Sequence, residues 1–230
     1  MHEARVLAEL LMHPVNADKG ILYLQTGDRR SAISYAQLLQ RAAGLSAFLA
    51  GRGMRPGDAL ILFVRDNRAF IDAFWACQLG GFIAVPLAGG VQSESLRKLQ
   101  GVAGLLEAPW LFSDRELYLR CRRDIDADTL FNTRVCLLED IGELHAEGAV
   151  HKAGPDDTAL LQFSSGSTGS PKGVQLTHAN LLANLRAIST GAEISATDAT
   201  LSWMPLSHDM GLVGFHLVPL FNGIDQVLMD

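Results

Sequence analysis

One short stretch of the chain, FSSGSTGSPKGVQLTH at residues 163–178, combines glycines, short hydroxyl side chains and a positive charge. Glycine lets the backbone adopt positive φ and turn its N–H groups toward an anion, and serine and threonine add short hydrogen-bond donors. This combination suits a polyphosphate, which offers many acceptor oxygens and several negative charges. The candidate phosphate-binding residues are Ser164, Ser165, Gly166, Ser167, Thr168, Gly169, Lys172 and Gly173.

Two common phosphate motifs do not describe this loop. A Walker A loop requires GxxxxGK[ST], but Pro171 stands five residues after Gly166, and the glycine spacing is not that of GxGxxG. The alternative is an ordinary serine- and glycine-rich surface loop. The neighbouring sequence favours phosphate binding, because the apolar run TALLQF (158–163) precedes the loop, Pro-Lys-Gly ends it, and a capped helix follows.

A second candidate site is LSHDMGLVG at residues 206–214, just after an apolar run. The pair His208–Asp209 could form a general base with an orienting carboxylate, or begin a metal site. Neighbours in sequence need not face one another, and no HxxxH or HxxE spacing supports zinc. Taken alone, such a pair is more often structural than catalytic.

Regular elements must position these two stretches, and the chain alternates apolar runs with helical patterns. Continuous apolar runs are typical of strands buried on both faces. Strands are expected at 59–64, 82–87, 109–112, 134–139, 158–163, 200–204 and 225–229. Helices are expected at 34–50 with a Ser34–Gln37 capping box, from an Asn67 cap to Gly80, at 93–104, at 179–188 and at 212–221. The alternation predicts a doubly wound α/β fold, with mainly parallel sheets and helices on both faces. The glycine-rich loop would then lie at the carboxyl edge, where such folds bind ligands.

Composition limits the class of protein. Of the 230 residues, 48% are apolar and 19% are charged, so the chain has enough apolar residues for a buried core. The net charge of −6 argues against nucleic acid or an anionic membrane as partner. Cys77, Cys121 and Cys136 lack CxxC spacing, so we expect buried free thiols in a reducing cytoplasm. No signal peptide or integral membrane segment is expected. The polar segment 142–157 is expected to be a surface loop and a possible subdomain junction.

Three stretches, in order along the chain, resemble motifs of one enzyme superfamily. SSGSTGSPKG (164–173) resembles the signature loop of the adenylate-forming enzymes, which include acyl-CoA synthetases, fatty acyl-AMP ligases, nonribosomal-peptide adenylation domains and luciferases. Residues 34–87 resemble the opening region of that superfamily, and LSWMPLSHDMGLVG (201–214) resembles a third motif at the usual distance after the loop. The resemblance implies that residues 1–230 are the N-terminal portion of a large AMP-binding domain.

The resemblance implies an ATP site in the loop. In that superfamily the loop holds the β- and γ-phosphates while a carboxylate attacks the α-phosphate, giving an acyl-adenylate and pyrophosphate, and Mg²⁺ spreads the charge. By matching position, Ser165, Ser167, Thr168 and Lys172 would contact the phosphates, with Thr168 and Lys172 as the catalytic residues. This fits the chemistry, because nucleotidyl transfer depends mostly on positioning and charge stabilisation.

The resemblance also assigns the second site to the acid substrate. A histidine at the place of His208 lines the carboxylate pocket in acyl-activating members and gates access to the thiol tunnel, so His208, Asp209, Met210 and Gly211 are expected to bind substrate. The sequence His-Asp-Met-Gly resembles the corresponding motif of fatty acyl-AMP ligases more than that of amino-acid adenylation domains. The apolar helix after Met210 would either wall an acyl tunnel or be an ordinary buried helix.

Enzymes of this superfamily are more than twice as long as this chain and need a later subdomain and a mobile C-terminal lid domain, for which the chain offers no candidates. We therefore expect an N-terminal portion that is catalytically incomplete alone. The leading hypothesis is a ligase that activates a fatty acid, or another carboxylic acid, and loads an acyl carrier protein. In a second hypothesis, the acyl group is transferred to coenzyme A. A third is a naturally short, non-catalytic module that binds a nucleotide or depends on a partner.

Overall fold

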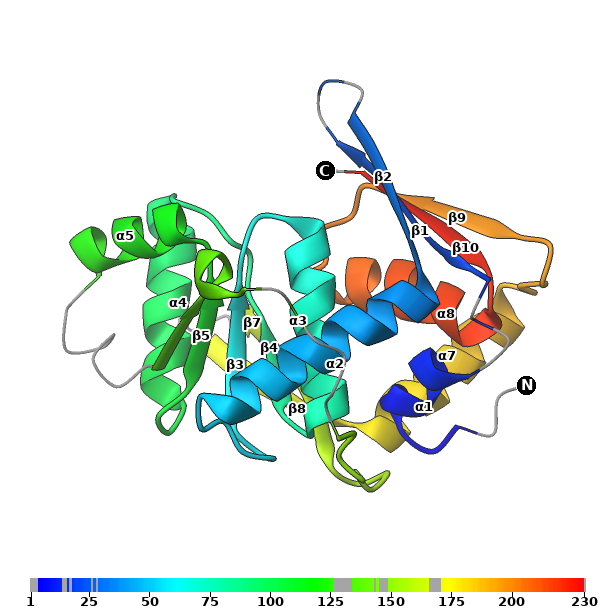
Figure 1. Ribbon diagram of the computed structural model, residues 1–230, viewed down its shortest axis with the longest axis horizontal. Helices are drawn as coiled ribbons and strands as arrows, with labels where there is room; N and C mark the ends of the chain where they lie inside the picture. Colours follow the sequence, from blue (N-terminus) through cyan, green and yellow to red (C-terminus); the bar gives the residue numbers. More distant parts are fainter. Residues whose placement is uncertain are drawn as a thin grey trace.

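The computed structural model describes residues 4–13, 16, 18–25, 27, 29–125, 134–142, 144, 149–165 and 171–229. Within these residues the strands form a six-stranded and a four-stranded sheet, with helices packed against both (Figure 1). Most neighbouring strands are parallel. The predicted α/β architecture, with mainly parallel sheets and helices on both faces, is confirmed.

The six-stranded sheet has the order β6-β5-β3-β4-β7-β8. Its strands are β3 (Ala59–Phe63), β4 (Ile83–Pro86), β5 (Trp110–Ser113), β6 (Arg134–Leu137), β7 (Thr158–Ser165) and β8 (Pro171–Thr177). The strands from β6 to β7 run parallel, and β8 returns antiparallel to β7. The sheet therefore ends in a hairpin, which the sequence did not predict.

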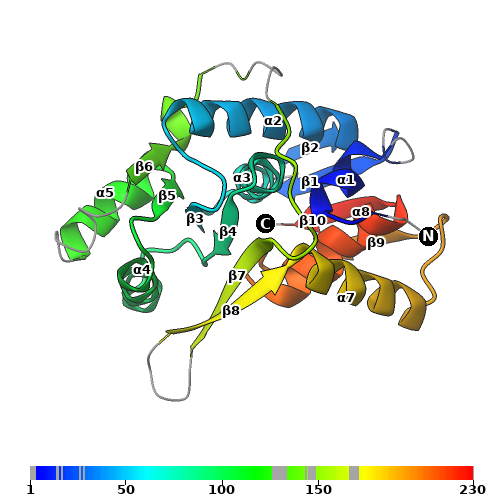
Figure 2. The ribbon, with the colours of Figure 1, turned by 90° about the horizontal axis from the view of Figure 1, so that it is seen from below.

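Both faces of this sheet are covered. Helices α2 (Tyr35–Gly51) and α3 (Asn67–Gly80) lie on one side, and α4 (Ser93–Leu105) and α5 (Arg115–Asp124) lie on the other (Figure 2). In β3, Leu60 and Leu62 belong to the core with α2 and α3, whereas Ile61 and Phe63 belong to the core with α4 and α5. Alternate side chains point to opposite faces of a strand, so a strand covered on both faces is apolar throughout.

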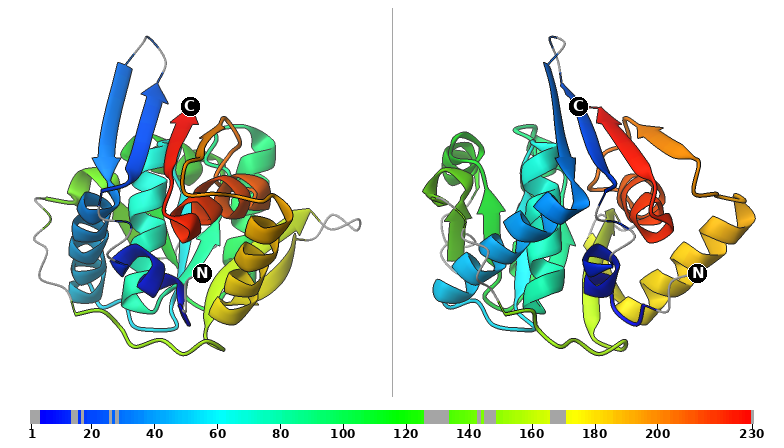
Figure 3. Two further views of the ribbon diagram at one scale, coloured as in Figure 1. Left: turned by 90° about the vertical axis from the view of Figure 1, so that its right-hand side faces the viewer. Right: turned by 45° about the vertical axis from the view of Figure 1, so that its right-hand side comes forward.

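The four-stranded sheet has the order β2-β1-β10-β9. Its strands are β1 (Gly20–Gln25), β2 (Arg29–Ser34), β9 (Ala199–Ser202) and β10 (Asp225–Met229). β1, β10 and β9 are parallel, and β2 is antiparallel to β1. The β1–β2 hairpin, which extends beyond the body of the molecule (Figure 3), was not predicted. Its strand β2 is an edge strand in which Ile33 alone is buried, so its sequence lacks an apolar run.

Helix α3 lies in the centre of the molecule (Figure 2). Every residue from Ala69 to Gly80 is buried. Its N-cap is Asp66, whose carboxylate accepts a hydrogen bond from Ala69 N at 2.7 Å, so the expectation that Asn67 is the cap was wrong by one residue. The helix ends at Gly80, and its C-cap is Gly81, whose φ of 70° is readily adopted by glycine.

The remaining helical segments are α1 (Leu7–Met12), η2 (Leu138–Asp140), α7 (His178–Gly191), η3 (Met210–Leu217) and α8 (Val218–Asn222). The Ser34–Gln37 capping box of α2 is present as predicted, and Thr177 and Asn180 form a second one at α7. Cys77, Cys121 and Cys136 are buried and free, which confirms that part of the expectation, and the reducing cytoplasm stays a prediction. Residues 142, 144 and 149–157 are irregular, as expected for a loop, and the subdomain junction there remains a prediction. In the described part of the chain, no helix is long and apolar enough to cross a membrane.

Candidate functional site

The candidate phosphate loop joins the two strands of the β7–β8 hairpin. β7 ends at Ser165 and β8 begins at Pro171, and these two residues pair across the hairpin. The hairpin forms one edge of the six-stranded sheet (Figure 2), and its Pro171 lies close to α4, because a Cβ atom at Gly101 would be 3.0 Å from Pro171 Cγ. Residues 166–170 lie outside the described residues, so the predicted phosphate contacts there, including those of the catalytic candidate Thr168, stay predictions. Four residues with predicted roles lie outside the described part of the chain: Gly166, Ser167, Thr168 and Gly169.

Lys172 and Gly173 belong to strand β8, not to a loop exit as expected, because backbone pairing with β7 continues to Pro171. Lys172 pairs with Ser164, and both residues are exposed. None of the ion pairs between described residues includes Lys172. An ammonium group without a carboxylate partner, next to the loop, is suited to holding an anion.

Gly173 has a packing role that the sequence did not reveal. A Cβ atom at this position would lie 3.0 Å from the ring of Phe163, whose side chain is buried in the core with α4 and α5. The glycine therefore lets this ring lie directly against the β8 backbone. A phosphate contact made by Gly173 stays a prediction.

Residues 207–211, called here the His208 segment, form a turn that opens into helix η3. His208, Asp209 and Met210 are exposed, and Gly211 is buried. Asp209 Oδ1 accepts a hydrogen bond from Met210 N at 2.8 Å and so caps the helix. In the described structure no hydrogen bond joins Asp209 to the His208 ring.

Gly211 is required by a close backbone approach. A Cβ atom there would lie 2.2 Å from the carbonyl oxygen of Pro205. The turn is closed by His208 N, which donates to Pro205 O at 3.1 Å, and by Leu212 N, which donates to His208 O at 2.9 Å. The segment is thus folded back on itself, with its polar side chains directed to the surface.

Helix η3 (Met210–Leu217) is a π-helix that continues into α8. The expected α-helix at 212–221 is therefore correct in place but wrong in type over most of its length. Its side chains Leu212, Val213 and Leu217 are buried in the main core. π-helical turns occur often at functional sites. Whether this helix also walls an acyl tunnel stays a prediction.

The two candidate sites are joined by Gln162. Its side-chain Nε2 donates to the carbonyl oxygen of Ser207 at 3.0 Å, although the residues are 45 positions apart. Gln162 stands three residues before the end of β7, and Ser207 directly precedes His208. The strand that leads into the phosphate loop is therefore in direct contact with the His208 segment.

His216 lies inside the protein at the centre of a hydrogen-bond chain. Trp75 Nε1 donates to His216 Nε2 at 2.8 Å, and because indole can only donate, the imidazole proton must be on Nδ1. Nδ1 then donates to Gln226 Oε1 at 2.9 Å, Gln226 Nε2 donates to Tyr35 Oη at 2.7 Å, and Tyr35 donates to Ile224 O at 2.9 Å. Burial lowers the pKa of His216 to about 4. His216 is therefore a neutral, fully buried histidine that holds this hydrogen-bond chain together.

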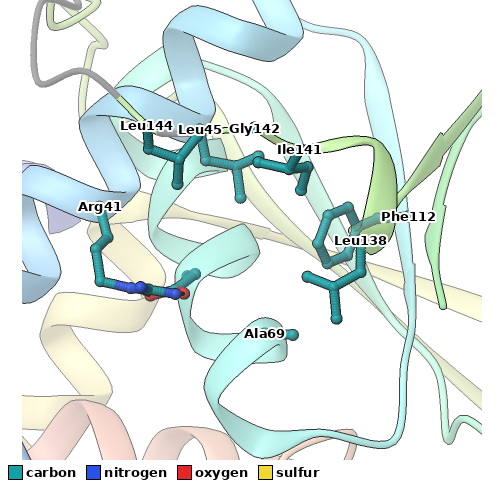
Figure 4. Close-up of a pocket in the computed structure, with 9 residues that line it drawn as sticks. Arg41, Leu45, Ala69, Phe112, Leu138, Ile141, Gly142 and Leu144 are labelled. Atoms are coloured by element: carbon teal, nitrogen blue, oxygen red, sulfur yellow. Dashed lines mark hydrogen bonds and ion pairs between the residues drawn. The ribbon is translucent and has the colours of Figure 1, made fainter.

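A cavity of about 550 Å³ lies between α2, α3 and the chain after β6 (Figure 4). Leu45, Phe112 and Ile141 contribute apolar walls, and the ion pair of Arg41 and Asp72 lines one side. Burial raises the pKa of Asp72, against the opposing effect of the Arg41 guanidinium. The residues that line the cavity include none from β7, β8 or the His208 segment, so this cavity is separate from the candidate site.

Comparison with known proteins identifies the family. Residues 15–230 match the family described as AMP-binding enzyme. The chain belongs to the AMP-binding enzyme family. It is 29% identical over 97% of its length to the medium-chain-fatty-acid–[acyl-carrier-protein] ligase TtuA of Teredinibacter turnerae, and covers 41% of that protein. It is also 29% identical over 86% of its length to a feruloyl-CoA synthase of Amycolatopsis sp., and covers 39% of it.

The fold of this chain agrees with solved structures. It superimposes with a TM-score of 0.86 and 30% identity on the fatty acyl-adenylate ligase from L. pneumophila in complex with acyl adenylate and pyrophosphate. The superposition covers 99% of this chain and 40% of the other. The chain thus spans about two fifths of the length of such relatives.

The structure brings some predicted site residues together and adds one. Ser164, Lys172 and the His208 segment lie on elements that Gln162 connects. Sequence reasoning missed Gln162 itself. The one signal was a polar residue in the otherwise apolar run TALLQF, and such a residue is usually taken as facing solvent.

Proposed function

We propose that this AMP-binding enzyme, together with the further elements that its relatives carry, uses ATP to activate a fatty acid as an acyl-adenylate. The observation that carries the proposal is the contact between the strand of the phosphate loop and the His208 segment, made by Gln162 and Ser207. Because one site suits a polyphosphate and the other is the expected acid site, their contact would place a carboxylate near the α-phosphate. The ligase from L. pneumophila, whose structure holds acyl adenylate and pyrophosphate, supports this proposal.

In the proposed reaction, ATP is the second substrate. A carboxylate oxygen attacks the α-phosphorus, the bond to the bridging oxygen of pyrophosphate breaks, and pyrophosphate leaves with the electron pair. Ser165, Ser167, Thr168 and Lys172 would hold the phosphates, and Lys172 would stabilise the charge that develops on the leaving group. No general base is required, because the carboxylate is already ionised near neutral pH.

His208, Asp209, Met210 and Gly211 would form the acid site. His208 is exposed, so it can reach an incoming carboxylate, whereas Asp209 caps η3 and Gly211 gives the turn its shape. Mg²⁺ would neutralise phosphate charge when bound. The described residues contain no cluster of three or more His, Cys, Asp or Glu side chains that could hold a metal ion, so these residues are assigned no direct part in binding it.

An acyl carrier protein is proposed as the acceptor of the acyl group, because TtuA, which matches nearly the whole chain, is a fatty-acid ligase of that kind. The similarity to a feruloyl-CoA synthase keeps coenzyme A as the alternative acceptor. Supplying each acceptor to the enzyme that holds the acyl-adenylate decides between them.

A protein that binds ATP but forms no adenylate would instead be the non-catalytic module. The proposed location is the cytoplasm.

Replacing Lys172 by alanine tests the proposal. In a protein with the further elements of the family, fatty-acid-dependent exchange of labelled pyrophosphate into ATP should fall by roughly a hundredfold or more, as expected for loss of a group that stabilises transition-state charge. The melting temperature should not change, because Lys172 is exposed. Lys152→Ala is the matched control, since Lys152 is also exposed but lies in the irregular segment 149–157. Unaltered exchange in Lys172→Ala would contradict the assignment.

A further inference from the structure

We propose that Gln162 is a positioning residue, which fixes the His208 segment relative to the strand of the phosphate loop and so sets the distance between the acid and nucleotide sites. This inference rests on the proposed function. Gln162 itself need not touch either substrate. Its side-chain amide acts through the backbone of Ser207, the residue that precedes His208.

The alternation of side chains along β7 directs Gln162 to the correct face. Phe163 points into the core with α4 and α5, so Gln162 points to the opposite face of the sheet, where the His208 segment lies. The carbonyl oxygen of Ser207 can only accept, so the amide NH₂ of Gln162 must face it. The orientation of the side-chain amide is therefore determined by its partner.

The His208 segment depends on this bond because its own side chains make few contacts. His208, Asp209 and Met210 are exposed, and Asp209 bonds to the adjacent residue. The bond from Gln162 is partly buried, so water competes with it less than at an exposed position. Oε1 of Gln162 is also buried and has no partner among the described residues. Removal of the Gln162 amide should make the His208 segment more mobile, because the hydrogen bond to Ser207 is lost. The hairpin should remain intact, because backbone pairing between β7 and β8 holds it.

Two substitutions separate the donor from the rest of the side chain. Gln162→Met keeps the length but removes both polar atoms, and Gln162→Glu keeps an acceptor oxygen but places it against the Ser207 carbonyl. Gln175→Met is the matched control, because Gln175 lies on the partner strand of the same hairpin and bonds to Thr158 at the far end from the loop. Both Gln162 variants should behave alike, and the control should behave as the unaltered protein.

Backbone hydrogen exchange tests the contact without any activity. The reporters are the amides of His208 and Leu212, which close the turn. Both should exchange roughly 5- to 10-fold faster in the Gln162 variants, as expected from loss of one hydrogen bond of ordinary strength, while amides of α3 are unchanged. Equal exchange in Gln162→Met, Gln175→Met and the unaltered protein would overturn the inference.

Kinetics test the positioning role in a protein with the further family elements. Gln162→Met should lower kcat/KM for the fatty acid by roughly 5- to 10-fold and leave the Kd for ATP unchanged, since the phosphate contacts are intact. A general loss of folding would instead weaken ATP binding and lower the melting temperature as well. Faster exchange with unchanged kinetics for the acid would overturn the positioning role. If the unaltered protein formed no adenylate, the proposed function would fail, and the exchange comparison would still decide the contact.

Discussion

The buried histidine at position 216 should make the stability of the protein depend on pH in a defined way. His216 is fully buried and accepts a hydrogen bond from Trp75 through Nε2, so it must be neutral in the folded state. The substitution His216→Gln removes the titrating group. Glutamine still offers one acceptor and one donor, which can serve Trp75 and Gln226.

The magnitude follows from the two pKa values. Burial lowers the pKa of His216 from 6.5 to about 4, so between these values the unfolded chain binds a proton that the folded protein does not. The free energy of unfolding therefore falls as the pH falls from 6.5 toward 4, and the full contribution is present above pH 6.5. At about 1.4 kcal/mol per pH unit, the contribution is roughly 3 kcal/mol.

Urea unfolding of both proteins at pH 7, 6, 5 and 4 measures this contribution. The carboxylates and the other histidines titrate in both proteins and cancel in the difference. At pH 7 His216→Gln should be less stable by about 1–3 kcal/mol, the usual cost of imperfectly paired buried groups. By pH 4 that deficit should have disappeared or changed sign, because the unaltered protein has lost roughly 3 kcal/mol by then. A difference that stays constant from pH 7 to pH 4 would refute the buried neutral histidine.

Two further substitutions test local packing and charge. Gly211→Ala should lower the free energy of unfolding by about 1–3 kcal/mol, because the new Cβ would lie 2.2 Å from Pro205 O. Gly214→Ala in the same helix should be nearly neutral, because the nearest atom to its Cβ is Met210 Sδ at 3.5 Å. Equal unfolding free energies for the two variants would contradict the close approach. Arg41→Met should cost about 1–2 kcal/mol at pH 7, because the buried Asp72 carboxylate loses its hydrogen-bonded partner while the Arg41 side chain is partly exposed to water. The loss should shrink as the pH falls and Asp72 takes up a proton. Adding Asp72→Leu should recover most of that stability, and failure to do so would show that the arginine acts through other contacts.

Two strands that the sequence predicted well are buried on two faces. β3 and β4 were expected within one residue at each end, because strands between two layers need apolar side chains throughout. β1–β2 and α5 were missed for the opposite reason. β2 has one buried residue, and α5 buries only Leu117 and Cys121 along a charged sequence.

The residue types of the candidate site stay a prediction, and the sequence did not indicate how its parts are connected. The glycine and hydroxyl pattern indicated an anion site, but it did not show that Lys172 lies in a strand paired with Ser164. The π-helix could not be recognised, since a uniformly apolar run has no periodicity that distinguishes π from α. The bond from Gln162 to Ser207 spans 45 positions, so only the folded chain reveals it.

The most direct test of the proposed function is to look for the product of the first step. The protein, with the further elements of its family, is incubated with ATP, Mg²⁺ and fatty acids of several chain lengths, and the products are analysed by mass spectrometry. The proposal predicts a fatty acyl-adenylate and pyrophosphate, and neither product with Lys172→Ala. Binding of ATP with no adenylate from any fatty acid or other carboxylic acid would contradict it and leave a nucleotide-binding module.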